Sequence, residues 1–148
     1  MATATEPVTT SAAREAQKLF FEIGMDHRAK VGARLVELSL TFVQAHALRL
    51  LDPERPLPMS SLAELLFCDA SNVTGIADRL ESRGLVERRS AEGDRRVKVL
   101  TLTPAGVELR SRVLEIMGEP PEAIASLSPA DQRALRDILR RAVAHLRD

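Results

Sequence analysis

Apolar residues recur every three to four positions over much of the chain, which is the spacing of one face of an α-helix. This pattern predicts a first helix over residues 14–38 and a last helix that begins at Ser128. Gly24 and Gly32 weaken the first helix and would allow a bend. The predicted apolar stripes are Leu19, Phe20, Ile23, Val31, Leu35 and Leu38 in the first helix and Leu135, Ile138, Leu139, Ala142, Val143 and Leu146 in the last.

Capping signals predict two more helices. Thr41 followed by Gln44 is a capping box, in which the hydroxyl accepts from one free amide and the glutamine side chain from another. The three prolines of residues 52–58 end this helix. A short helix follows, with Ser61 as its cap and Glu64 three residues later. The apolar stripe of the helix after Thr41 is predicted to be Val43, Ala47, Leu50 and Leu51.

A further helix follows almost at once. Asp69 is a good N-cap, and Gly84 is a good stop signal. The apolar stripe between them is Val73, Ile76, Ala77 and Leu80. Two short helices joined by a tight turn make a candidate helix-turn-helix.

Alternating polar and apolar residues then predict a β-hairpin, with strands at 85–90 and 95–102 joined by residues 91–94. Alternation places Val97 and Val99 on one face of the second strand. The other face carries Arg96, Lys98, Leu100 and Leu102. The distal part of this strand is thus predicted to be polar, and its proximal part to return to the core.

Two helices complete the chain, each with a capping hydroxyl, Thr103 or Ser128, followed by a proline. The order of elements predicts a mainly α fold with a small β-hairpin wing, that is, a winged helix-turn-helix with N- and C-terminal dimerisation helices. The predicted divisions are a flexible tail at 1–10, N-terminal helices for dimerisation and the core at 11–56, the winged helix-turn-helix at 57–103, and C-terminal dimerisation helices at 104–148.

The 148 residues include 21 basic and 21 acidic side chains, so the formal net charge is zero. That balance argues weakly against a nucleic-acid binder, but the charges are unevenly distributed. Residues 79–98 hold a local cationic excess, to which Arg88 and Arg89 at the base of the hairpin contribute. We expect these two to face phosphates or solvent. The cations of this stretch are Arg79, Arg83, Arg88, Arg89, Arg95, Arg96 and Lys98, and the anions are Glu81, Glu87, Glu92 and Asp94.

Polar residues dominate the face of the predicted recognition helix that lies opposite its apolar stripe. They are Ser71, Asn72, Thr74, Gly75, Asp78 and Arg79. A recognition helix brings its N-terminal residues to base edges in the major groove, where asparagine can pair with adenine and threonine can touch a thymine methyl group. The alternative is an ordinary solvated face, and the cationic hairpin behind the helix favours DNA.

Cations at the tip of a β-ribbon can reach phosphates or enter the minor groove, where narrow stretches attract arginine. Arg95, Arg96 and Lys98 are the candidates. Asp94 lies two residues before Arg96, so both project on the same side of an extended strand and the carboxylate can hold the guanidinium. The alternative is an edge strand protected by charge from aggregation, which explains the acid less well.

Other chemistry has little support in the sequence. Cys68 is the single cysteine, so no internal disulfide can form, which fits a cytoplasmic location; we expect a buried thiol. The three histidines lack metal-ligand spacing, and no catalytic or phosphate-loop motif is present. No apolar run has the length of a membrane span, and "MATATEPVTT" has no signal-peptide character. We therefore predict no enzyme, cofactor, metal site or membrane association.

The chain resembles the MarR family of transcriptional regulators. The resemblance is carried by "LTFVQAHALRLL", "SLAELLFCDASNVTGIADRLESRGLVERR", "DRRVKVLTLTPAG" and "LSPADQRALRDIL". Its most specific parts are "RLESRGLVER" and the wing pattern made by Asp94, Arg96, Leu102, Thr103 and Gly106. In this order and spacing these two parts are a strong signal. The four stretches together cover nearly all the chain from about residue 38 onward, and the first predicted helix is compatible with the family.

The resemblance implies a homodimer, formed by the first and the last two helices, that binds a pseudo-palindromic operator in double-stranded DNA. It implies a repressor released by a small, often phenolic, anion, although the effector-binding residues stay unknown. It places Arg96 in the minor groove, with Asp94 as its positioner. The full set of predicted DNA-contacting residues is Ser71, Asn72, Thr74, Gly75, Arg79, Arg95, Arg96 and Lys98.

Two departures from the family pattern qualify this expectation. Gly75 stands where many members carry a longer, often basic residue, which predicts weak readout at that base. The first predicted helix has no cysteine, which argues against the peroxide-sensing subtype. A winged helix that binds another protein rather than DNA is the alternative function.

Overall fold

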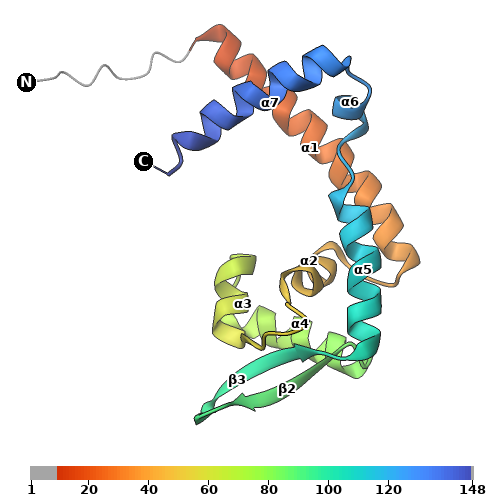
Figure 1. The fold of residues 1–148 in the computed structure, drawn as a ribbon, viewed down its shortest axis with the longest axis vertical. Coiled ribbons are helices and arrows are strands. Elements are labelled where there is room, and N and C mark those ends of the chain that lie inside the picture. Colours follow the sequence, from red (N-terminus) through yellow and green to blue (C-terminus); the bar gives the residue numbers. More distant parts are fainter. Residues whose placement is uncertain (1–9, 148) are drawn as a thin grey trace, which may run out of the picture. The chain divides into compact units, whose positions relative to one another are not determined.

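The computed structural model describes residues 10–147, and it shows a mainly helical chain with one small sheet (Figure 1). The helices are α1 (Ser11–Glu37), α2 (Phe42–Leu50), α3 (Met59–Leu66), α4 (Ala70–Ser82), α5 (Pro104–Gly118), α6 (Glu122–Ala125) and α7 (Pro129–Ala144). The strands are β1 (Leu57–Pro58), β2 (Val86–Ala91) and β3 (Asp94–Leu102). The predicted fold class is confirmed. All but the last residue of the tail predicted at 1–10 lies outside the described residues.

The chain divides into two compact units. The winged-helix unit runs from Lys30 to Glu119, and the terminal unit combines the chain up to Ala29 with the chain from Pro120 onward. Helix α1 contributes to both units and stays helical through its two glycines. Helix α5 lies within the winged-helix unit, so the boundary predicted at residue 104 falls inside that unit.

Most of the predicted caps form as expected. Thr41 and Gln44 make the reciprocal capping box, with both hydrogen bonds present. The Thr103 and Ser128 hydroxyls each accept a bond from a backbone amide three residues on. The Ser61 cap is wrong, because α3 already begins at Met59 and makes no side-chain cap bond. The first turn of α3 follows β1 directly, which moves the helix start ahead of the serines.

Strand β1 was missed by the sequence pattern, which identified residues 52–58 only as a helix end. Leu57 pairs with Leu100 and Pro58 with Val99, giving an antiparallel sheet in the order β1–β3–β2. Two residues are too few to show alternation, so this strand has no sequence signature. Its pairing anchors the proximal half of β3 to the loop before α3.

The pairing of β2 with β3 changes towards the wing tip. Ser90 pairs with Lys98, but the next partners are Ala91 and Asp94, so residues 95–97 have no partners in β2. Such a bulge bends a strand and re-aims its side chains. Val97 is exposed, whereas Val99 and Leu100 are both buried, so the proximal part of β3 returns to the core as predicted.

The winged-helix unit closes its own hydrophobic core. Helix α2 packs against α3, α4 and α5. More of its surface is therefore covered than the single apolar stripe predicted from the sequence. Val43, predicted as core, is exposed, whereas Leu48 is completely buried. The largest fully buried side chains of this core are Leu35, Leu48, Leu51, Leu62, Val73, Leu80, Val86, Leu100 and Val113.

Gly106 permits a close approach between α5 and the start of the wing. A Cβ atom at this position would lie 1.9 Å from the carbonyl oxygen of Leu85. The same carbonyl accepts the amide of Thr103. Only glycine fits here without a shift of backbone, which gives a physical reason for the glycine in the wing pattern.

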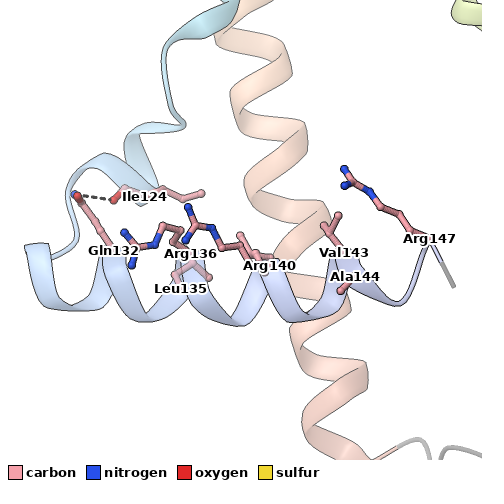
Figure 2. A pocket seen from close by; sticks show the side chains of 9 residues that line it. Ile124, Gln132, Leu135, Arg136, Arg140, Val143, Ala144 and Arg147 are labelled. Atoms are coloured by element: carbon pink, nitrogen blue, oxygen red, sulfur yellow. Dashed lines mark hydrogen bonds between the residues drawn. The ribbon is translucent and has the colours of Figure 1, made fainter.

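The terminal unit leaves most of its apolar surface exposed. No residue of α7 is buried, although its apolar stripe is present as predicted. A groove of about 750 Å³ runs along this helix, with Leu135, Leu139 and Val143 on its wall and Arg136 and Arg140 beside them (Figure 2). In α1, Phe20 and Leu19 are likewise exposed. Over residues 10–147, no helix is both long enough and apolar enough to cross a membrane.

Candidate nucleic-acid interface

The start of α4, the candidate recognition helix, is held by Asp69. Its carboxylate accepts bonds from the Asn72 amide at 3.0 Å and the Ser71 hydroxyl at 2.8 Å. These hydrogen bonds, with the Asn72 amide contributing most, lower the pKa of Asp69 below its ordinary value. The cap therefore keeps its negative charge at neutral pH and fixes the first turn of the helix.

The polar residues predicted to read bases fall into two groups, those whose side chains have partners within the chain and those whose side chains have none. The hydroxyl of Thr74 donates to the carbonyl of Ala70 at 2.9 Å, and that of Ser71 donates to Asp69. Among the described residues, the side chains of Asn72 and Arg79 make no hydrogen bond or ion pair. Asn72 and Arg79 thus keep their full donor capacity, whereas the hydroxyls are engaged within α4 or its cap.

A hollow of about 250 Å³ lies against this polar face. It is lined by Ser71, Asn72, Gly75, Ile76 and Arg79 of α4 and by Thr41 and Gln44 at the start of α2. A Cβ atom placed on Gly75 would meet no other atom within 4 Å. The packing of the chain therefore does not require glycine at the centre of this face.

Of the predicted wing cations, Arg95 and Arg96 lie on the bulge of β3, and Lys98 lies next to it. Gly93 turns the chain with a φ of +86°, a conformation that glycine adopts without strain. Arg95 and Arg96 follow after Asp94, and among residues 10–147 their side chains have no hydrogen-bond or ion-pair partner. The Lys98 ammonium donates to the Ser90 hydroxyl at 3.0 Å.

Asp94 holds the backbone of Arg96 rather than its guanidinium. Its carboxylate accepts the Arg96 amide at 2.9 Å, and no carboxylate–guanidinium pair between these residues is formed in the described part of the chain. The expected geometry is corrected in this respect. A short acid two residues before an amide readily closes such a local turn, so Asp94 shapes the strand from which the Arg96 side chain projects.

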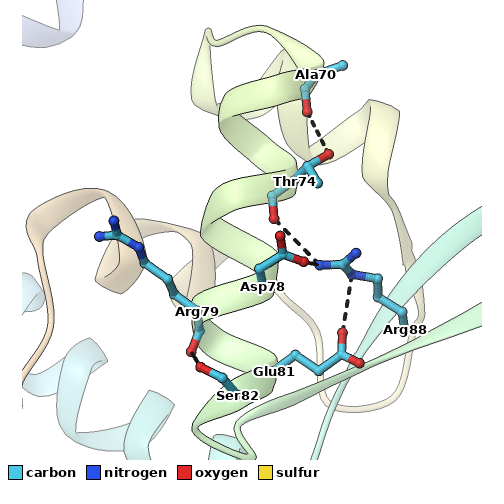
Figure 3. Close-up of polar contacts among 7 residues, drawn as sticks. All are labelled: Ala70, Thr74, Asp78, Arg79, Glu81, Ser82 and Arg88. Carbon is cyan, nitrogen blue, oxygen red and sulfur yellow. Dashed lines mark hydrogen bonds and ion pairs between the residues drawn. The ribbon is translucent and has the colours of Figure 1, made fainter.

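Arg88 was predicted to face phosphates or solvent, but its side chain makes contacts within the chain. From β2 it reaches across to α4, where it pairs with the carboxylates of Asp78 and Glu81 (Figure 3). The Nε atom of Arg88 lies 3.2 Å from Oε2 of Glu81. Arg89, on the same strand, is exposed and pairs with its neighbour Glu87 at 2.6 Å.

Arg83 is also used within the fold. Its guanidinium donates to the carbonyls of Ser39 and Leu38 at 2.8 and 3.0 Å, where α1 has just ended. The cationic stretch therefore divides into arginines with partners inside the chain and a smaller set that faces outward. Within residues 10–147, the arginines of this stretch that have no hydrogen-bond or ion-pair partner are Arg79, Arg95 and Arg96. Sequence spacing could not identify the partners of Arg83 and Arg88, because these partners lie on other elements.

Cys68 lies in the turn of the helix-turn-helix and is only half-buried, packed beside the core. The predicted buried thiol is thus only partly correct. Its neighbour Phe67 has a φ of +51° and an almost fully exposed side chain, which the sequence pattern did not reveal. No group of three or more histidine, cysteine or acidic side chains that could hold a metal ion occurs among the described residues.

The fold and this interface define a winged helix-turn-helix protein. Residues 40–98 match the model of the MarR family. The uncharacterized HTH-type transcriptional regulator YdgJ of Bacillus subtilis (strain 168) is 30% identical over 120 residues, covering 80% of this chain and 69% of that protein. The chain belongs to the MarR family.

Two further proteins with known roles are similar to this chain. The transcriptional repressor MprA of Escherichia coli (strain K12) is 36% identical over 93 residues, covering 59% of this chain and 50% of MprA. The crystal structure of AbsC, a MarR family transcriptional regulator from Streptomyces coelicolor, superimposes with a TM-score of 0.73 at 26% identity, covering 93% of this chain and 96% of AbsC. The chain spans only 50–61% of the length of four curated relatives that it matches, MprA among them.

Proposed function

We propose that this protein is a transcriptional regulator that binds double-stranded DNA in a sequence-specific manner. The observation that carries the proposal is the pairing of an outward polar face on α4 with unpartnered arginines on the wing. An α-helix fits the major groove of B-DNA, and a β-ribbon tip with arginine suits the adjacent minor groove or phosphates. Family membership supports the same conclusion.

In the proposed complex the residues divide their tasks. Asn72 and Arg79 read base edges or phosphates from the major groove, with Ser71, Thr74 and Gly75 forming the close surface between them. Arg96 enters the minor groove, Arg95 and Lys98 contact the backbone, and Asp94 sets the path of the strand. The free amide of Asn72 can pair with adenine through two bonds.

We further propose a homodimer on a pseudo-palindromic operator. Helix α7 is amphipathic but buries nothing within one chain, and α1 exposes a phenylalanine pair. Two-fold packing of these faces would cover them and would bring two recognition helices to one side of a duplex. A cytoplasmic repressor is the form that we propose, supported by the similarity to MprA, with release by a small anionic or phenolic effector.

Arg96→Ala tests the interface directly. We expect operator affinity to fall by about tenfold or more, because a minor-groove arginine contributes both charge and fit. Lys98→Ala, which removes one cation from the same strand, is the matched control and should cost less. Quantitative gel shifts measure both. Affinity of Arg96→Ala equal to that of the parent would exclude the wing assignment.

The dependence of binding on salt tests the class of partner. Each phosphate neutralised by the protein releases counterions, so affinity for duplex DNA falls steeply as salt rises. Fluorescence anisotropy with labelled duplexes across a salt series measures the slope. A flat titration would favour the alternative, a winged helix that binds a protein.

A further inference from the structure

Two carboxylates lie on the recognition helix beside the face proposed to meet DNA. The side chains of Asp78 and Glu81 keep relative exposures of 61% and 45%. Phosphate groups repel nearby carboxylates, and like charges brought together at an interface oppose binding strongly. The outward surface of α4 is therefore less favourable to DNA than its other polar residues suggest.

Arg88 offsets these charges from the neighbouring strand. Its guanidinium pairs with both acids, and one of its terminal nitrogens lies 3.5 Å from the carbonyl oxygen of Thr74, one turn earlier (Figure 3). Arg79 projects from a different side of the helix (Figure 3). A guanidinium carries five donors in a fixed fork, so one arginine can serve two carboxylates at once.

The hairpin does not depend on this contact for its position. Val86 and Leu100 are completely buried at its base, and β1 pairs with β3 there. An ion pair that is partly exposed adds little to stability. Its larger effect is on the charge that α4 presents.

We propose that Arg88 is a positioning residue for DNA binding. It shields Asp78 and Glu81 from the phosphates, and it does not itself contact the duplex. This inference rests on the proposed function, since the shielding matters only if α4 meets nucleic acid.

The test compares Arg88→Ala with the triple variant Asp78→Asn, Glu81→Gln, Arg88→Ala in the full chain. The probe is the duplex that the wild-type protein selects from a randomised DNA pool. We expect Arg88→Ala to lose about tenfold or more in affinity, because two unshielded carboxylates then face phosphates. The triple variant should recover to within about threefold of wild type, because neutral amides need no shielding.

The two explanations of Arg88 differ in this rescue. If Arg88 contacts a phosphate directly, removing the acids cannot replace it, and a triple variant that stays about tenfold weak would overturn the inference. If circular dichroism shows that Arg88→Ala does not fold, the affinity of the triple variant is compared with that of the wild type. This comparison still distinguishes shielding of the two acids from a direct contact between Arg88 and a phosphate. A wild-type protein that selects no duplex would overturn the proposed function and this inference together.

Arg89→Ala is the matched control. Arg89 lies beside Arg88 on β2, but its partner Glu87 is on the same strand and not on α4. We expect a change within about threefold, as for an exposed pair. An equal loss in the two arginine variants would indicate a general effect of net charge and would also overturn the specific role of Arg88.

Discussion

The winged-helix unit and the terminal unit use apolar residues in opposite ways. The first buries leucines and valines from α1 to α5 in one core. The second carries a stripe of the same residue types on α7 and buries none of them. A solvated apolar stripe of this regularity is costly unless a partner covers it. The first unit folds by its own packing, whereas the packing of the second would be completed by another chain in the homodimer that we propose.

The largest effect is expected from breaking the exposed stripe. Leu139→Glu together with Val143→Glu places two charges in the groove of α7, where a dimer would desolvate them. We expect monomers in analytical ultracentrifugation and a loss of about 100-fold or more in operator affinity, since two half-sites no longer act together.

Arg133→Glu is the control for this change, because helical spacing places it opposite the stripe. It should leave the dimer intact. A dimer that persists in the double variant would show that the stripe is not the dimer contact, and the contrast between the units would then need another explanation.

A smaller effect tests how tightly the winged-helix unit is closed. Gly106→Ala forces a methyl group against the Leu85 carbonyl, whose oxygen lies 1.9 Å from the ideal Cβ position. We expect a loss of roughly 2 kcal/mol or more in the free energy of unfolding, because backbone must move. Urea denaturation measures it.

Gly118→Ala provides the comparison within the same helix, because a Cβ there meets nothing within 4 Å. It should be neutral or mildly stabilising. Equal stability of the two variants would mean that α5 can shift without cost, and that the unit is less closed than its packing indicates.

The smallest effect concerns the outward face of the same unit. Gly75→Ala should raise stability by about 0.5–1 kcal/mol, because alanine is the better helix former and the site is open. We expect operator affinity to fall nonetheless, since the added methyl group occupies the surface proposed to approach the bases. Thermal melting measures the change in stability, and gel shifts measure the change in operator affinity.

Gly32→Ala, also helical and also open to a Cβ, should stabilise without weakening DNA binding. If Gly75→Ala bound DNA as well as the parent, close approach of the backbone at that position would be excluded.

Local patterns predicted much of the fold because their causes are local. The Thr41 and Asp69 caps, the Gly84 stop and the hairpin turn depend on residues close to one another in the chain, and all form. The Ser61 cap failed because the helix start follows a strand whose partner is distant. Strand β1 was missed for the same reason, since its pairing joins Leu57 to Leu100.

The candidate interface shows the same limit. Its residues were identified from the exposed face of α4 and from the charges of the wing, and as DNA contacts they stay predictions. The spacing of residues in the sequence could not identify the partner of each charged side chain. Arg88 and Arg96 look alike in sequence, yet one reaches a neighbouring helix and the other projects from a bulge.

The sequence alone determined the order of elements, most of their caps and the residue types on each face, because these follow from helical and strand periodicity. Tertiary structure alone decided which arginines are neutralised within the chain, which residues of α2 are buried and why Gly106 must be glycine. Each of these depends on atoms brought together from distant segments. An ion pair or a close backbone approach has no periodicity, so it can be read only once the chain has folded.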